Sequence, residues 1–356
     1  MRLNVLVLTK YGMLGASSRM RFLQYLPWMQ QAGFEITIQP LLSDELLLAR
    51  YQRGAYGVWS LLRAYALRLL VLLRLHQFDV VWIEKEALPW FPALFERWLL
   101  RGKPYILDFD DAIFHNYDLH QSVWVRRLYG QRIDRLMAGA RLVIAGNHYL
   151  AERAISAGAM HVEVMPTVVD LARYAVKSSY SMTIIPRIVW IGSPSTLKYL
   201  WELSAPLAAL NKLYPFILLV IGGGDLAMPG VEVETVVWAA ETEASAISEC
   251  DIGIMPLRDT PWEQGKCAYK LIQYMACGLP TVASPIGANL EVVVEGETGF
   301  FADGHADWIE KLGLLLSDRA LRHRLGLAGR TRVEAEYCLQ QTAPKLLGFF
   351  TAEINK

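Results

Sequence analysis

Strand-length apolar runs alternate with helix-length patterns along almost the whole of this 356-residue chain. Such alternation predicts a parallel β-sheet covered by helices on both faces. Ligands of these sheets bind in the crevice beyond the carboxyl ends of the strands. In the first half of the chain, the strand-like runs lie at 3–8, 34–38, 80–83, 105–107 and 142–145.

The pattern is interrupted by an irregular polar stretch at 171–186 and then restarts. A chain of this length also exceeds what one ordinary hydrophobic core holds. We therefore expect an α/β protein with two doubly wound, Rossmann-like domains, at 1–170 and 187–340, and a cleft between them. A C-terminal helix at 341–356 could pack back on the first domain. The strand-like runs of the second half lie at 188–192, 216–221, 251–255 and 281–283.

The composition is that of a well-packed globular protein, with 53% apolar and 20% charged residues. The formal net charge is +0, but residues 1–180 hold 21 Lys and Arg against 15 Asp and Glu. The second half has the opposite excess, so the two halves should meet different partners. We expect no nucleic acid among them.

The four cysteines, at 250, 267, 277 and 338, show neither CxxC spacing nor paired histidines. They are expected to be buried thiols in a reducing compartment, and no metal site can be recognised. The first strand-like run follows the amino terminus without the pattern of a secretory leader. We expect a cytoplasmic protein that needs no cofactor.

Segment 46–78 contains no acidic residue, while five arginines are scattered among Leu, Val, Trp and Tyr. Each arginine costs roughly 2.5–3.5 kcal/mol at mid-bilayer, which argues against a transmembrane helix. One interpretation is a helix lying on anionic lipid at the inner face of the plasma membrane. The other is a core-covering helix whose arginines snorkel to water. Arg63 and Arg74 share a helical face, but Arg68 lies away from it.

Residues 265–283 indicate a loop, a helix, a tight turn and a buried strand. Gly265 gives a flexible approach to a helix N-terminus, where the amides up to Cys267 and Ala268 can bind an anion. Lys266 and Lys270 are four residues apart and therefore share one helix face. The combination suggests a diphosphate held beside the edge of a sheet.

A second strand, loop and helix start occurs at 192–198. Ser195 and Thr196 offer hydroxyl groups, and Lys198 places a cation in the first helical turn, where it opposes the helix dipole. An anionic partner explains this best, and Lys198 could converge with Lys266 and Lys270 on one diphosphate. The glycines at 222–224 are a weaker signal, because they do not form GxGxxG, and they leave a dinucleotide oxidoreductase poorly supported.

The loop at 9–21 brings two glycines, Gly12 and Gly15, to the end of the first strand. These glycines let the backbone approach a ligand, and the serines at 17 and 18 can cap the next helix. Arg19 and Arg21 would then lie near the cleft. The alternative is a simple capped helix with exposed arginines.

Carboxylates follow two more strands at the same expected edge. Of the three acids at 108–111, Asp110 and Asp111 are candidates to hold sugar or acceptor hydroxyls, because so many acids there need a partner. Magnesium is conceivable, but three clustered acids do not establish it. Glu86 is a second acceptor candidate, with a solvated loop glutamate as the alternative.

With these residues in place, the chain resembles the retaining glycosyltransferases of family 4, which have the two-domain GT-B fold. The resemblance covers nearly the whole length. Its most specific parts are 270–287 and 291–300, and its moderately specific parts are 17–21, 108–111 and 192–198.

The resemblance implies a donor scheme that this chain follows only in part. The family commonly has one glutamate for the donor sugar and a second for the ribose, and here Gly265 and Gln273 occupy these positions. Gln273 can still hydrogen-bond ribose hydroxyls, and Glu263 is a candidate substitute for the first. The chain resembles the branch of the family with a GK-x3-K-x2-Q-Y-M-A-C-G pattern. The donors of this family are usually UDP-, GDP- or dTDP-sugars.

The resemblance also implies a mechanism of charge neutralisation. Lys198, Lys270 and the amides of 265–268 would stabilise the leaving diphosphate. Gly12, Gly15, Arg19, Ser195 and Thr196 would contact the donor, and Asp110 with Asp111 would position the sugar or acceptor. The acceptor would be a saccharide or a lipid-linked saccharide of cell-surface synthesis. A nucleotide-sugar 2-epimerase, and a non-catalytic nucleotide-sugar-binding assembly subunit, are the alternatives.

Overall fold

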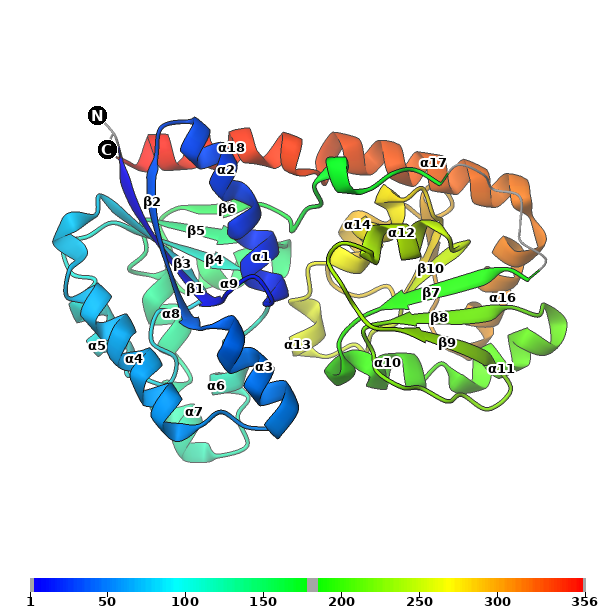
Figure 1. The fold of residues 1–356 in the computed structure, drawn as a ribbon, viewed down its shortest axis with the longest axis horizontal. Coiled ribbons are helices and arrows are strands. Elements are labelled where there is room, and N and C mark those ends of the chain that lie inside the picture. The colour runs from blue at the N-terminus through cyan, green and yellow to red at the C-terminus, as the bar shows by residue number, and fades with distance from the viewer. Residues whose placement is uncertain (1–2, 178–184, 355–356) are drawn as a thin grey trace. The chain divides into compact units, whose positions relative to one another are not determined.

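The computed structural model describes residues 3–177 and 185–354. It leaves the side chains at 51–52 and 353–354 undescribed. Of the linker expected at 171–186, residues 178–184 lie outside the described residues. The chain divides into two compact units, which are drawn in Figure 1. Unit 1 combines residues 1–167 with 342–356, and unit 2 holds residues 168–341.

Unit 1 contains a six-stranded sheet in the order β2-β1-β3-β4-β5-β6, and every neighbouring pair is parallel. The order reverses between β1 and β3, so the crevice for a ligand lies where these two strands end. Strands buried on both faces need continuous apolar runs, which is why Val5 to Leu8 are completely buried. The strands are β1 (Asn4–Tyr11), β2 (Glu35–Leu42), β3 (Val80–Glu84), β4 (Tyr105–Phe109), β5 (Leu142–Ala145) and β6 (Val162–Val164).

Local capping sets several helix limits in unit 1. The Ser43 hydroxyl accepts a hydrogen bond from the Leu46 amide at the start of α3, and Gly54, with φ of 76°, ends that helix. The α-helices are α1 (Ala16–Arg21), α2 (Leu26–Gln31), α3 (Asp44–Arg53), α4 (Val58–Leu72), α5 (Ala93–Leu99), α6 (His115–Asp118), α7 (Val123–Tyr129), α8 (Arg132–Met137) and α9 (His148–Ser156). Short 3-10 turns are η1 (Leu23–Tyr25) and η2 (Leu75–Gln77).

The last helix, α18 (Leu339–Ile354), contributes its later residues to unit 1. Phe350 is completely buried there, and its ring centroid lies 5.4 Å from that of Trp82 in the central sheet. The Tyr25 and Thr342 hydroxyls are 2.8 Å apart. The start and the end of the chain therefore share one core, since Tyr25 and Thr342 are 317 positions apart.

Unit 2 repeats the architecture with the strand order β12-β11-β10-β7-β8-β9, again parallel throughout. Here the order reverses between β7 and β10. The strands are β7 (Arg187–Ile191), β8 (Ile217–Ile221), β9 (Glu232–Val236), β10 (Ile252–Met255), β11 (Thr281–Ala283) and β12 (Gly299–Phe301).

Helices pack on the unit 2 sheet around a core that includes Trp190, Leu218, Ile254, Trp308 and Leu325. They are α10 (Leu197–Trp201), α11 (Ser204–Leu213), α12 (Glu243–Ser248), α13 (Pro261–Gln264), α14 (Tyr269–Ala276), α15 (Asn289–Val292), α16 (His305–Ser317) and α17 (Arg319–Glu336), with 3-10 turns η3 (Leu171–Arg173) and η4 (Pro194–Thr196). The predicted pair of doubly wound, Rossmann-like sheets is confirmed. Among the described residues, no helix combines the length and apolar character needed to cross a membrane.

Candidate functional site

The crevice of unit 2 lies where β7 and β10 separate, and Tyr274 of α14 spans it. The Tyr274 hydroxyl accepts a hydrogen bond from the Ile191 amide at 3.0 Å and donates to the Ile254 carbonyl at 3.3 Å. Gly253 on β10 makes room for this ring, because a Cβ there would lie 2.3 Å from the Tyr274 ring. The sheet therefore fixes α14 at the crevice through a residue that the sequence analysis had not assigned.

Two glycine loops meet at the carboxyl ends of β7 and β8. A Cβ on Gly222, whose φ is +77°, would lie 2.7 Å from the Gly192 carbonyl oxygen. A Cβ on Gly192 would lie 2.4 Å from the Trp190 ring, and one on Gly223 would lie 3.0 Å from the same ring. Only glycine permits this approach, so these residues do more than form a turn.

Lys270 lies over the same tryptophan, with its Nζ 4.5 Å from the Trp190 ring centroid. Trp190 thus joins the two glycine loops and the first turn of α14, a role that the sequence analysis missed. A tryptophan inside an otherwise aliphatic strand was the available signal.

Lys270 is partly buried and, within the described part of the chain, its side-chain nitrogen has no hydrogen bond or ion pair. Burial, and then the positive charge of Lys266, lower the pKa of its ammonium to about 7. A cation held at such cost without a counterion indicates a site for an anionic ligand. Lys266 lies beside it, with its Nζ 5.5 Å from the Trp262 ring centroid.

The loop before α14 has a conformation suited to a ligand. Ala268 is buried and adopts φ of 50° and ψ of 21°, a left-handed conformation that is costly for alanine. Ala268 is the N-cap of α14. Of the amides expected there, those of Gly265 and Lys266 already donate to the Trp262 and Glu263 carbonyls, at 3.3 and 3.0 Å. Cys267 is buried beside Ala268, and none of the four cysteines, all of which lie within the described residues, forms a disulfide.

The predicted loop at 192–198 is open to solvent. Ser195 is exposed, and its hydroxyl lies 2.9 Å from that of Ser193. The Thr196 hydroxyl donates to the Ser193 carbonyl at 2.9 Å. Lys198 is exposed, with its Nζ 4.8 Å from the Tyr199 ring centroid. Both this loop and α14 therefore supply cations to one end of the sheet.

Gln273 is buried and belongs to a polar network that the sequence did not reveal. Its Nε2 donates to the Tyr174 hydroxyl at 2.8 Å, which in turn donates to a Glu243 carboxylate oxygen at 3.0 Å. Trp238 Nε1 donates to the other Glu243 oxygen at 2.7 Å. Burial, followed by the neighbouring Tyr269 and Glu243, raises the pKa of Tyr174 well above its usual value. Glu243 thus places a buried carboxylate two hydrogen bonds away from Gln273.

The Glu263 carboxylate is already occupied within unit 2. It is buried in α13 and accepts hydrogen bonds from the hydroxyls of Tyr199 and Thr260. Burial favours its neutral form, but these two hydrogen bonds outweigh burial and lower its pKa. Gly265 ends α13 in a helical conformation. Gly265, where the family resemblance predicts a sugar-binding glutamate, therefore offers no carboxylate, and Glu263 is held by its own neighbours.

In unit 1, Asp110 and Asp111 converge on Lys85, which the sequence analysis did not single out. The Lys85 Nζ lies 2.7 Å from an Asp110 oxygen and 3.6 Å from an Asp111 oxygen, and it donates to the Ser17 hydroxyl at 3.3 Å. Lys85 follows β3 with φ of 64°, a strained conformation for lysine. Asp111 is the more accessible carboxylate of the pair.

These charges are strongly coupled. Burial would raise the pKa of Asp110, but the Lys85 ammonium outweighs this and holds that pKa at about 2. Burial would lower the pKa of Lys85, and the two aspartates raise it above its usual value. The site therefore holds an ionised lysine and an ionised aspartate at neutral pH.

The other acids of this edge stabilise the loop after β1. A Glu84 oxygen accepts hydrogen bonds from the Lys10 amide at 2.7 Å and the Ser18 hydroxyl at 2.6 Å. The expectation that the serines cap α1 is wrong, because Gly15 is the N-cap and both serines lie inside the helix. Ser18 instead joins α1 to the end of β3, because the glutamate needs donors once it is buried.

The arginines and glycines of this loop also have internal partners. Arg21 is buried and pairs with Asp108 at 2.7 Å, so the alternative of an exposed Arg21 is wrong. Arg19 donates to the Met13 carbonyl at 2.8 Å. A Cβ on Gly12 would lie 2.7 Å from the Asp44 carboxylate, and one on Gly15 would lie 2.3 Å from the Tyr11 side chain.

Glu86 is a member of an internal ion-pair network rather than a solvated loop residue. An Arg132 Nη2 lies 3.0 Å from Glu86 and 2.6 Å from Glu96, and the Tyr117 hydroxyl donates to Glu86 at 2.8 Å. Burial raises the pKa of Glu86, and the Arg132 charge opposes the shift. The predicted acceptor contact thus falls on a carboxylate that already has partners.

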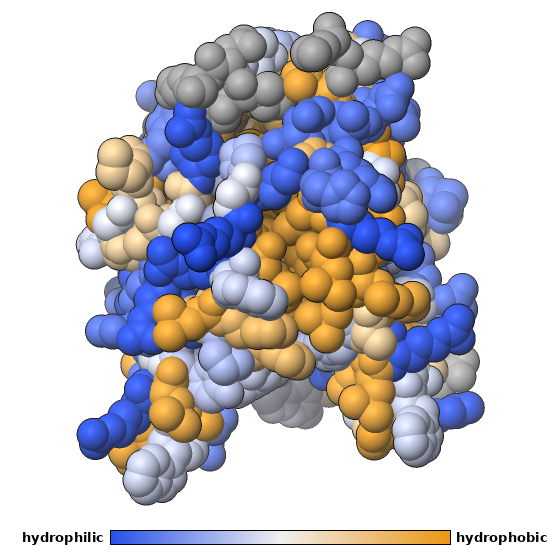
Figure 2. Space-filling model, turned by 90° about the vertical axis from the view of Figure 1, so that its left-hand side faces the viewer, coloured by the Kyte–Doolittle hydropathy of each residue, from blue (hydrophilic) through white to orange (hydrophobic). Residues whose placement is uncertain are grey.

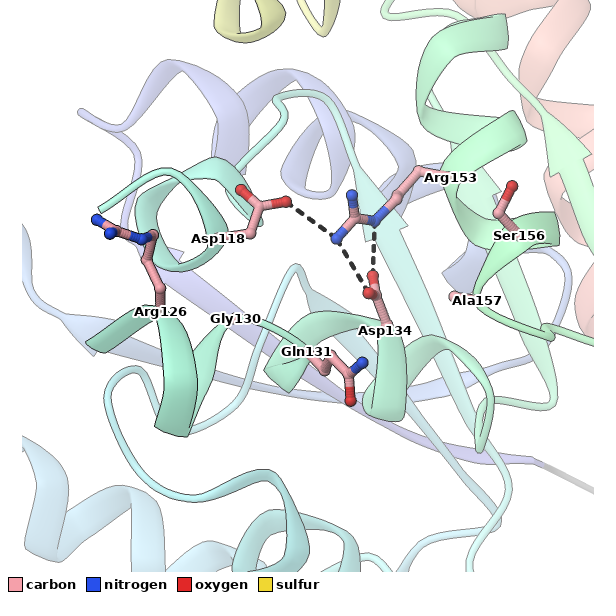
Figure 3. A pocket seen from close by; sticks show the side chains of 8 residues that line it. All are labelled: Asp118, Arg126, Gly130, Gln131, Asp134, Arg153, Ser156 and Ala157. Carbon is pink, nitrogen blue, oxygen red and sulfur yellow. Dashed lines mark hydrogen bonds and ion pairs between the residues drawn. The ribbon is translucent and has the colours of Figure 1, made fainter. Parts of the chain in front are cut away.

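A surface hollow of about 460 Å³ lies elsewhere in unit 1 and contains none of the predicted residues. Arg153 bridges Asp118 and Asp134 across it, with nitrogen–oxygen distances of 3.0 and 2.7 Å (Figure 3). The charges of Arg153, Asp118 and Asp134 are therefore already paired with one another. Among the described residues, no group of three or more His, Cys, Asp or Glu side chains is arranged to hold a metal ion.

Residues 185–318 match the family described as Glycosyl transferases group 1. A D-inositol 3-phosphate glycosyltransferase of Arthrobacter sp. (strain FB24) is 32% identical over 87 residues, or 24% of this chain and 20% of the relative. Spore coat protein SA of Bacillus subtilis is 34% identical over 79 residues, or 21% of each. The chain thus matches about a fifth of the length of these curated relatives.

Solved structures match over almost the whole chain. A sucrose-phosphate synthase from Thermosynechococcus elongatus has a TM-score of 0.71 at 15% identity, covering 99% of both chains. Anabaena HepE in complex with UDP and glucose has a TM-score of 0.70 at 14% identity, covering 99% of this chain and 100% of that one. The chain therefore has the GT-B fold, and its residues 185–318 are similar to the Glycosyl transferases group 1.

Proposed function

We propose that this chain is a retaining glycosyltransferase of family 4, of the GK-x3-K-x2-Q branch. It moves a sugar from a nucleoside diphosphate sugar to a saccharide or lipid-linked acceptor in cell-surface polysaccharide or glycoconjugate synthesis. The observation that carries this proposal is Lys270, a partly buried cation at the N-terminus of α14 inside the group 1 domain. The UDP and glucose bound by Anabaena HepE support a UDP-sugar as donor.

Stabilisation of the leaving diphosphate drives the reaction. Lys270 neutralises the charge that develops on it, with help from Lys198 and the last amides of the loop before α14. Donors that are already oriented lose little energy to reorganisation in the transition state. The acceptor hydroxyl attacks from the face that the leaving group departs, and a phosphate oxygen takes its proton, so the anomeric configuration is retained. This step needs neither a protein nucleophile nor a metal, and we expect EDTA to leave turnover unchanged.

The remaining donor contacts divide between hydroxyls and the Gln273 network. Ser195 and Thr196 bind phosphate oxygens, and Gln273 binds the ribose. Tyr174 and Glu243 orient the Gln273 amide through the chain of hydrogen bonds, which compensates for the missing second glutamate.

In unit 1, Asp111 positions the sugar or acceptor, because it is the more accessible of the two aspartates. Asp110 holds Lys85 in place rather than acting on substrate. Donor contacts by Gly12, Gly15 and Arg19, and an acceptor contact by Glu86, stay predictions. We place the protein at the cytoplasmic face of a membrane, on the strength of segment 46–78.

Transfer by a Lys270→Ala variant tests the proposal. The expected result is severe loss of transfer from UDP-sugars with an unchanged circular dichroism spectrum. Lys212→Ala, at an exposed position on α11, is the matched control and should behave as the wild type. Full turnover of Lys270→Ala would refute the assignment.

Two alternatives give different outcomes in the same assay. A nucleotide-sugar 2-epimerase would release an epimerised nucleotide sugar when incubated with donor alone, whereas a transferase requires the acceptor. A non-catalytic assembly subunit, favoured by the glycine at position 265, would bind the nucleotide sugar without transferring it to any acceptor in a broad panel.

A further inference from the structure

Three helices of unit 1 expose large apolar side chains. Trp59 of α4 is 84% exposed, Trp98 of α5 is 62% exposed and Trp124 of α7 is 73% exposed. Single exposed apolar residues are ordinary, but several tryptophans on neighbouring helices are not. Other exposed apolar residues on or beside these helices are Val58, Leu62, Leu67, Leu70, Leu73, Leu94, Val123 and Leu128.

Ring contacts place the three helices side by side. Tyr65 of α4 stacks on Phe91 with centroids 5.6 Å apart, and Phe91 stacks on Phe95 of α5 at 5.8 Å. Trp90, next in the chain to Phe91, lies 6.4 Å from Tyr129 at the end of α7. Figure 2 faces this side of unit 1 and shows hydrophobic residues gathered at its centre with hydrophilic residues around them. We call the outward sides of α4, α5 and α7 the tryptophan face.

The charge on the tryptophan face has one sign. Arg63, Arg97 and Arg127 are exposed on α4, α5 and α7, and Arg74 and Arg101 are exposed just beyond two of these helices. Neither α4 nor α7 contains an acidic residue. The single acid of α5, Glu96, is completely buried against Arg132. The face therefore presents apolar side chains and arginines, and its three helices present no exposed carboxylate.

The inward-facing arginine of α4 explains why the helical pattern of segment 46–78 is imperfect. Arg68 is buried and donates hydrogen bonds to the carbonyls of Thr9, Gln39 and Ala87. It connects α4 to the sheet, so it does not interrupt the outer face. A core-covering helix accounts for the buried Arg68, but it does not account for tryptophans in water.

The charge pattern also distinguishes between occupants of the face. In a symmetric dimer the same patch would meet its own copy, and unpaired arginines would oppose arginines. An anionic bilayer supplies the missing negative charge, and tryptophan prefers the level of the lipid head groups. Helices with apolar and arginine-bearing sides lie in that plane.

We propose that the tryptophan face docks unit 1 on the surface of an anionic lipid bilayer. The three tryptophans enter the head-group region, and the arginines contact lipid phosphates. This inference extends segment 46–78 to α5 and α7, and it holds whatever sugar or acceptor the protein uses.

Vesicle co-sedimentation of the full chain tests the proposal. Binding to phosphatidylcholine vesicles that contain phosphatidylglycerol should greatly exceed binding to phosphatidylcholine alone. It should weaken as salt shortens the Debye length from ~10 Å at 0.1 M to ~3 Å at 1 M. Equal binding to both vesicles, or no binding to either, would overturn the proposal.

Two sets of variants separate the apolar and the charged contributions. The double variant Trp59→Ser with Trp124→Ser should reduce partitioning into vesicles at least about tenfold, because each substitution removes apolar area that enters the interface. Its control is Trp201→Ser, at a half-exposed tryptophan of unit 2, which should bind as the wild type. Arg63→Gln with Arg127→Gln should reduce partitioning by about 25-fold, or about fivefold for each charge.

The control for the arginine pair is Arg319→Gln with Arg324→Gln, two exposed arginines of α17 in unit 2. Thermal melts of all variants confirm that unit 1 still folds. If light scattering shows a dimer that dissociates in Trp59→Ser with Trp124→Ser, a second copy covers the face and the lipid proposal fails. Wild-type vesicle binding by both pairs of variants would refute it equally.

Discussion

The neutral amine of Lys270 should take up a proton when a nucleoside diphosphate binds. Burial lowers the pKa of this group to about 7 in the unliganded protein, so only about one-tenth of it is protonated at pH 8. A bound diphosphate favours the charged form and returns the pKa toward its ordinary value. Binding at pH 8 should therefore be coupled to uptake of about 0.9 proton.

Calorimetric titration with UDP measures this coupling. The observed enthalpy is compared between two buffers with different ionisation enthalpies, and the difference gives the number of protons. A terminal phosphate titrates near pH 6, so at pH 8 the nucleotide itself contributes little. The affinity for UDP should also fall by almost a factor of ten for each pH unit above 8, because the free proton concentration falls tenfold.

Substitutions at Lys270 separate charge from proton uptake. Lys270→Arg keeps a permanent cation and should bind UDP without taking up a proton. Lys270→Ala loses a charge-assisted hydrogen bond of about 1.5–3 kcal/mol, which weakens binding by about 10- to 150-fold. Proton uptake that persists in Lys270→Arg, or its absence from the wild type at pH 8, would refute the reasoning.

Three further predictions concern stability, and chemical denaturation measures each of them. Lys270→Met should stabilise the unliganded protein on the order of 2 kcal/mol after solvent screening. The pKa of Lys270 is lower in the folded than in the unfolded protein, so the gain in stability is full below pH 7 and disappears as the pH rises toward 10.5. A stability gain that grew with pH would contradict this reasoning. Arg68→Leu should cost about 3–5 kcal/mol because it leaves buried carbonyls without donors, whereas Arg63→Leu should change stability by less than about 0.5 kcal/mol. Gly253→Ala should cost about 1–3 kcal/mol by forcing a methyl group against the Tyr274 ring, and a neutral result would show that α14 can move away.

The architecture could be predicted from the sequence because its signals are local. Continuous apolar runs such as 188–191 and 217–221 specify strands that are buried on both faces, and their alternation with helices requires parallel connections. The limits of the helices were harder to predict from the sequence, because they depend on single contacts. Helix α1 starts at Ala16, before the two serines predicted to cap it, and the Ser18 hydroxyl bonds to Glu84 instead.

The candidate site was predicted in part for the same reason. Lys270 and the amides before it are neighbours in the chain, so their spacing alone indicated an anion site. The partners of Asp110 and Gln273 come from other strands and loops, and no local pattern reports them. Lys85 lies 25 positions before Asp110, and Tyr174 lies 99 positions before Gln273.

The sequence by itself determined two parallel-sheet domains and a cationic helix start in the second, because hydrophobic periodicity and residue spacing act over short range. Only the tertiary structure decided which charges are paired. It placed Glu86 and Glu263 against internal donors, and it left Lys270 beside Trp190 without a counterion. The physical reason is that burial and the distance to an opposite charge set the state of an ionisable group, and both depend on residues distant in the chain.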